Sequence, residues 1–205
     1  MAYLHASKPA IRRRMAPAGH SMIPNREWTW EIVNEFTQSE QLKRHMLSVE
    51  AAMRAYARKY GEDEERWGVT GLIHDFDYES GPTEHPSRGM RILGERGVDQ
   101  SVLDDIASHA DLGVPRDTKL RQALNAVDEL CGFIIACTLV KPDKSLRAVE
   151  ASTVRKKMKD KAFARGVHRE EMLQGAEELG VDFDEHVVFV RDALVPIASQ
   201  LGLNS

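Results

Sequence analysis

Apolar residues recur at helical spacing along most of this chain. The clearest stripe places residues three, four or seven positions apart, at Leu42, Val49, Met53, Tyr56 and Tyr60. No segment shows the alternation of apolar and polar residues that is typical of a half-buried strand. An aromatic content of only 6% also favours helix over sheet. The sequence therefore predicts an all-α fold.

Start and stop signals divide this pattern into separate helices. Asn25 and Ser39 are favourable N-cap residues, and Gly61 suits the end of a helix. Gly81 and Pro82 place a loop over residues 76–84. The expected helices cover residues 26–36, 40–60, 62–75, 86–96, 101–110, 118–140, 168–179 and 183–201. We interpret residues 1–23 as a loose lead-in and residues 24–205 as one domain.

Composition limits the cellular setting and the partners. A formal charge of −4 gives no basic field for generic nucleic-acid binding. The uncharged apolar stretch over residues 132–140 is far too short to cross a bilayer. No apolar run follows Arg12–Arg14, so no secretory signal is visible. Cys131 and Cys137 form no disulfide framework, and we expect a cytoplasmic protein with no membrane partner.

Ionisable residues on the apolar helix faces carry the chemical information. His45 falls on the stripe described above, His74-Asp75 closes a later apolar run, and His109 and Asp128 continue two further apolar faces. A buried carboxylate is costly unless it is paired or binds a cation. A shared metal explains all of these residues, and histidine with carboxylate suits Fe, Mn, Co, Ni or Zn.

The order of these residues resembles the H…HD…D signature of the HD superfamily. His45, the pair His74-Asp75 and Asp128 occur in that order within residues 39–140. Members of this superfamily are helical and mostly hydrolyse phosphate esters of nucleotides. The resemblance implies an HD-type helical bundle in which these four residues ligate one divalent transition metal.

Two more histidines extend the resemblance to dinuclear members of the superfamily. His85 precedes Pro86 and the following helix, and His109 lies in the segment ASHAD. By resemblance, both would join the ligand set and Asp75 would bridge two metals. Many relatives place Lys or Glu three residues after the Asp, where this chain has Tyr78. The GYP element is also absent from the sequence, which argues against cyclic-di-GMP as the substrate.

Candidate catalytic residues are Asp75, Asp77 and Glu79. A metal held by Asp75 would lower the pKa of water from 15.7 to about 7 and offset charge on phosphoryl oxygens. Asp77 and Glu79 lie beside the HD pair, where they could orient ligands, carry protons or simply face water. The sequence leaves these alternatives open.

Basic residues must hold the phosphate, because no Gly-rich phosphate cradle is present in the sequence. The candidates are Arg88, Arg116 and Lys144. A basic run over residues 155–165 offers a further candidate, although we favour a solvated helix face for it.

The leading hypothesis is therefore a metal-dependent phosphohydrolase acting on a small phosphorylated substrate, a nucleotide or dinucleotide. A diiron oxygenase on the same scaffold uses a similar ligand set and is the second hypothesis. A nucleotide-sensing domain that keeps a metal for stability is the third. A homo-oligomer is compatible with the sequence, which does not determine the oligomeric state.

Overall fold

The computed structural model describes residues 21–205, so most of the expected lead-in lies outside the described residues. Within that part of the chain every regular element is helical, and extended residues meet only in isolated bridges. The predicted all-α fold is confirmed. The helices are α1 (Arg26–Phe36), α2 (Glu40–Tyr60), α3 (Glu64–Ile73), α4 (Ser87–Glu95), α5 (Gln100–Ala107), α6 (Lys119–Leu139), α7 (Ala151–Met158), α8 (Arg169–Leu179) and α9 (Phe183–Leu194), with 3-10 turns at Tyr78–Ser80, Leu146–Ala148 and Val195–Ile197.

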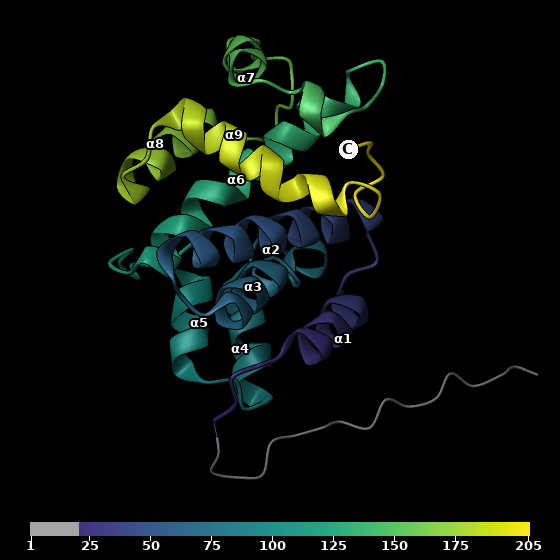
Figure 1. Ribbon diagram of the computed structural model, residues 1–205. Helices are drawn as coiled ribbons and strands as arrows, with labels where there is room; N and C mark the ends of the chain where they lie inside the picture. The colour runs from purple at the N-terminus through teal and green to yellow at the C-terminus, as the bar shows by residue number, and fades with distance from the viewer. Residues whose placement is uncertain (1–20) are drawn as a thin grey trace, which may run out of the picture.

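Helix α2 lies at the centre of the bundle and contacts α3, α6 and α9 (Figure 1). It contributes to two apolar cores. The larger core contains Val49 of α2 and Val127 of α6, together with residues of α7, α8 and α9. The smaller core contains Met46 of α2 and Ile73 of α3, together with residues of α1, α4 and α5. His45 of α2 directly precedes Met46 of the smaller core, and Asp128 of α6 directly follows Val127 of the larger core.

The predicted starts of α1 and α2 are confirmed, and in both helices a side chain caps the first turn. The side chain of Asn25 accepts a hydrogen bond from the backbone N–H of Trp28, and that of Ser39 accepts one from Leu42. Gly61 ends α2 with a φ of 71°, the left-handed conformation that glycine adopts without steric cost. Local side-chain chemistry thus determines these helix boundaries.

Some predicted boundaries were wrong. Helix α3 ends at Ile73 rather than at residue 75, and α5 ends at Ala107, so His109 lies in the turn after its helix. Helix α9 ends at Leu194, and a 3-10 turn containing Pro196 follows, because proline has no N–H to continue an α-helix. Pro86 occupies the N-cap of α4 rather than its first helical position. Helix α7 was not predicted as a separate element.

Helix α6 is the only helix among residues 21–205 that is long and apolar enough to cross a membrane. However, 61% of its apolar window is buried in the protein, where α6 packs against α2, α8 and α9. The apolar surface of α6 therefore has a sufficient explanation in the core. Cys131 and Cys137 on this helix are buried and free, as expected from their spacing.

A buried hydrogen-bonded chain links three helices of the larger core. The hydroxyl of Tyr56 on α2 lies 2.6 Å from Nδ1 of His186 on α9. The other ring nitrogen, Nε2, lies 2.9 Å from the carbonyl oxygen of Ala126 on α6. If His186 Nε2–H donates to this carbonyl, Nδ1 accepts from the tyrosine hydroxyl and the neutral imidazole is fully satisfied.

We expect this histidine to make the fold sensitive to acid. Burial lowers the pKa of His186 from 6.5 to about 4. The unfolded chain therefore binds the proton first, and as the pH falls from about 6.5 to 4 the folded state loses about 3 kcal/mol of stability through this group. The measurement is urea unfolding of the wild type and His186→Gln across this range. Their difference in unfolding free energy should change with pH, and a constant difference would contradict the prediction.

Candidate metal centre

Four predicted ligand residues converge from two helices and the turn that follows a third. His45 comes from the second turn of α2, Asp128 from the middle of α6, and His74 and Asp75 directly follow the end of α3. Oδ1 of Asp128 lies 3.0 Å from Nε2 of His45 and 3.4 Å from Nε2 of His74. Oδ2 of Asp75 lies 3.7 Å and 3.5 Å from the same two nitrogens. We call His45, His74 and Asp128 the first ligand group.

The other two predicted histidines form a second ligand group with Asp75. Nε2 of His85 lies 3.1 Å and Nε2 of His109 lies 3.5 Å from Oδ1 of Asp75. The two Nε2 atoms are 3.0 Å apart. In sum, the two oxygens of Asp75 face different groups, Oδ2 toward the first and Oδ1 toward the second. This is the arrangement that a bridging carboxylate requires.

A close approach between α2 and α3 brings the first group together. Gly71 on α3 faces the backbone of Val49 on α2, and a Cβ at Gly71 would lie 3.1 Å from it. That contact is tighter than most side chains allow, so a larger residue would push the helices apart. The carbonyl oxygen of Gly71 also lies 2.8 Å from Nδ1 of His74. Sequence reasoning did not single out Gly71, although its position three residues before His74 was a usable signal.

The Nδ1 atoms of three histidines in the two ligand groups lie close to oxygen atoms. Nδ1 of His74 contacts Gly71, Nδ1 of His109 contacts the carbonyl of Ile106, and Nδ1 of His85 contacts the carboxylate of Asp77. If Nδ1 carries the proton in each ring, Nε2 presents a lone pair to the centre. Such partners orient the histidine ligands of metal sites and select their tautomer.

The residues present fit a metal ion. Nε2 of His74 is fully buried and has no hydrogen-bond partner among residues 21–205, although buried ring nitrogens are normally satisfied. It points toward two carboxylates and a second imidazole, the donor types that first-row transition metals bind. A cation shared by these atoms would satisfy this nitrogen.

The charges of the centre also favour a cation. Burial lowers the pKa of His74, but the negative charges of Asp75 and Asp128 outweigh burial and raise this pKa to about 9. Burial opposes ionisation of Asp128, yet the positive charge of His74 and the contact with His45 hold its pKa well below its usual value. Both carboxylates therefore remain ionised at neutral pH, and positive charge must balance them, from protons or from a metal.

Asp77 and Glu79 occupy different places although they are two residues apart. Asp77 is fully buried, and it accepts hydrogen bonds from His85 at 2.8 Å and from the backbone N–H of Gly89 at 2.7 Å. Glu79 is directed away from this network and accepts hydrogen bonds from the backbone N–H groups of Gln38 and Ser39. Asp77 thus orients a ligand histidine, whereas Glu79 ties its turn to the start of α2.

We expect Asp77→Asn to weaken metal binding by the second ligand group about 10- to 100-fold, because His85 loses its charged hydrogen-bond acceptor. The first group should keep its affinity. Titration of the metal-free protein with Mn²⁺ measures both affinities. The matched control is Glu79→Gln, which should leave both unchanged, and equal effects of the two variants would contradict the assignment.

The predicted phosphate-binding residues lie at different places. Arg88 contacts the hydroxyl of Ser80, in the turn that follows the HD pair. Nε of Arg116 donates to the carbonyl of Ser108 at 2.9 Å, directly before His109. Lys144 lies in the turn after α6, where its carbonyl accepts from Asn204 near the C-terminus. Arg88 and Arg116 are thus connected to the turns that carry ligands, while Lys144 belongs to the contact between α6 and the end of the chain.

The basic run over residues 155–165 spans the end of α7 and the turn after it. Arg155 pairs with Asp184 and lies over the ring of Phe183, and Lys157 lies over Phe163. Lys156, Lys159, Lys161 and Arg165 are exposed. This distribution agrees with the favoured interpretation of a largely solvated surface.

A third group of metal-ligating side chains lies on the surface at the start of α8. Nδ1 of His168 is 2.9 Å from Oε1 of Glu129 and 3.7 Å from Oε1 of Glu171. The side chain of His168 is 69% exposed and that of Glu171 is 54% exposed. Exposed ion pairs of this kind are common and contribute little stability, so the buried centre has the stronger chemical signature.

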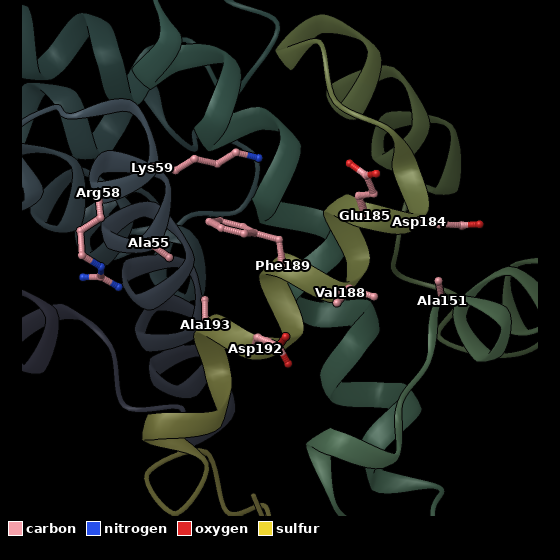
Figure 2. Close-up of a pocket in the computed structure, with 10 residues that line it drawn as sticks. All are labelled: Ala55, Arg58, Lys59, Ala151, Asp184, Glu185, Val188, Phe189, Asp192 and Ala193. Atoms are coloured by element: carbon pink, nitrogen blue, oxygen red, sulfur yellow. The ribbon is translucent and has the colours of Figure 1, made fainter.

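A groove of about 910 Å³ lies between α2 and α9 and reaches Ala151 at the start of α7 (Figure 2). Phe189 points from α9 toward α2 in this groove, and Lys59 lies 4.9 Å from the centre of its ring. Asp184 and Asp192 at its rim pair with arginines of the protein. No residue that lines the groove belongs to either ligand group, so its volume is separate from the metal centre.

Comparison with protein families matches residues 42–179 to the HD domain. The matched segment runs from the first turn of α2 to the end of α8 and contains all six residues of the two ligand groups. Comparison with curated proteins and with solved structures found no match.

Proposed function

The chain belongs to the HD superfamily of metal-dependent phosphohydrolases, and we propose that it hydrolyses a small phosphate ester, a nucleotide or dinucleotide. The observation that carries this proposal is the position of Asp75, whose two oxygens face separate histidine groups. A shared carboxylate between two nitrogen-rich groups suits a pair of transition metals. Bound there, the metals would supply water activation at neutral pH and compensate charge on phosphoryl oxygens.

The protein orients the histidine rings of the centre and leaves one side of the centre open to a substrate. His74 is fully buried and held by Gly71, and His85 is held by Asp77, so these rings are positioned before a substrate arrives. In contrast, the side chains of His45 and Asp128 remain about one-fifth exposed. A substrate can therefore approach the centre from this open side. A purely structural metal site would need no such opening.

Net charge and cysteine content support a proposal for the kind of substrate and for the cellular location. We propose a small phosphorylated substrate rather than a polymer, since the net charge of −4 provides no overall attraction for nucleic acid. The two free cysteines are compatible with the reducing cytoplasm, where we place the protein.

The test is a panel of phosphate esters assayed with protein loaded with Mn, Co, Fe, Ni or Zn. We expect phosphate release that disappears on chelation and returns when metal is added. His74→Ala should be inactive, whereas the exposed His168→Ala should retain activity as the matched control. Activity that survives chelation or His74→Ala would overturn the proposal, and oxygen uptake without phosphate release would favour an oxygenase.

A further inference from the structure

Tyr78 is an exposed aromatic residue beside the second ligand group. Its residue is 48% exposed, and it belongs to neither apolar core. Its ring lies 5.3 Å from the ring of His85, centre to centre, at an interplanar angle of 78°. The aromatic side chain thus contacts a metal-ligating histidine on one side and remains open to solvent on another. Packing in the core does not explain its position.

The backbone that carries Tyr78 is fixed on both sides. Its N–H donates to the carbonyl of Asp75 at 3.0 Å, and its carbonyl accepts from the N–H of Gly81. The next residue, Glu79, binds two backbone N–H groups at the start of α2. An exposed ring on a rigid turn loses little conformational entropy when a ligand packs against it.

The guanidinium of Arg88 lies against the turn that carries Tyr78. Arg88 contacts Ser80, two residues after Tyr78, and no carboxylate among residues 21–205 lies within ion-pair distance of its guanidinium. The adjacent N–H of Gly89 donates to Asp77, which in turn holds His85. The turn at Tyr78–Ser80 therefore carries an aromatic ring beside His85, and the guanidinium of Arg88 on α4 lies against Ser80 of the same turn. Together they match a molecule that joins an aromatic ring to a phosphate.

We propose that Tyr78 determines substrate specificity by stacking against a planar aromatic group, the base of a nucleotide, while its phosphate lies at the metal centre. This inference rests on the proposed function, and it assigns the side chain that would recognise the base of the proposed nucleotide or dinucleotide. Stacking requires the ring of Tyr78 and not its hydroxyl group.

The experiment compares adenosine 5′-monophosphate with glycerol phosphate as substrates of the metal-loaded full chain. Tyr78→Ala should lower kcat/KM for the nucleotide about tenfold or more, mainly through KM, because base stacking on an aromatic side chain is lost. Glycerol phosphate, which has no ring, should be affected less than about twofold on the same reasoning. Tyr78→Phe should behave like the wild type. Leu139→Ala is the matched control, since Leu139 is 49% exposed at the far end of α6.

Equal losses for both substrates would overturn the proposal, as would a loss of activity in Tyr78→Phe, which would indicate a role for the hydroxyl in proton transfer. Calorimetric binding of adenosine 5′-monophosphate to the metal-loaded protein separates this proposal from the proposed function. If the wild type hydrolyses no phosphate ester, the proposed function fails. The binding measurement then decides the stacking proposal. The proposal requires that Tyr78→Ala binds the nucleotide at least about tenfold more weakly than the wild type. Equal binding by the two proteins would overturn it.

Discussion

Asp75→Asn is expected to abolish metal binding by both ligand groups and to lower kcat for phosphate ester hydrolysis on the order of 1,000-fold or more. Oδ1 of Asp75 lies 3.1 Å from His85 and Oδ2 lies 3.5 Å from His74, so a single side chain serves both groups. Asparagine keeps the shape of the side chain but has one oxygen, no charge, and an amide nitrogen that cannot act as a ligand. Elemental analysis of the purified protein measures the metal content.

The control for this prediction is Asp192→Asn. Asp192 is an aspartate on α9 whose side chain is 52% exposed and pairs with Arg191, in the groove away from the centre. This variant should keep its metal and its activity. Circular dichroism checks that Asp75→Asn retains its helices. If folded Asp75→Asn still bound two metals per chain, the bridging role would be disproved.

The double variant His85→Ala, His109→Ala is expected to bind one metal per chain where the wild type binds two. The first ligand group keeps all three of its residues, and Asp75 Oδ2 still faces it. Loss of the second group should lower kcat about 100-fold or more, because one of the two charges that compensate the phosphoryl oxygens is missing. Metal stoichiometry and kcat are measured on the same preparation.

His45→Ala provides the comparison for the double variant, since it removes a ligand from the first group instead. We expect it to reduce binding to the first group while His85, His109 and Asp75 remain in place. A wild-type stoichiometry of one, unchanged in the double variant, would show that the second group does not bind metal. The centre would then be mononuclear.

The six candidate ligand residues were named from the sequence on two kinds of signal, apolar helical spacing and the resemblance to a known motif. His45 and Asp128 interrupt apolar helical stripes, which is costly unless the residue has a partner. The adjacent pair His74-Asp75 matches a known motif. The spacing signals are local, since each depends on the residues of one helix. The convergence of these residues was a hypothesis, and the contacts between 3.0 and 3.7 Å that Asp75 and Asp128 make with His45 and His74 agree with it.

The different positions of Asp77 and Glu79 could not be predicted from the sequence. Both are carboxylates in the loop after the HD pair, and the sequence treats them alike. The structure buries Asp77 against His85 and directs Glu79 to the backbone at the start of α2. This difference depends on the direction of a short turn and on what packs beside it. Neither factor leaves a periodic signal in the chain.

The sequence by itself determined the helical class, most helix starts and the identity of the candidate ligands, because caps and apolar spacing act over a few residues. Only the tertiary structure decided which oxygen of Asp75 faces which histidines, how Gly71 lets α3 approach α2, and that Tyr78 lies open beside His85. These features depend on contacts between residues far apart in the chain. Such contacts form only when both apolar cores pack together, and helical periodicity does not encode them.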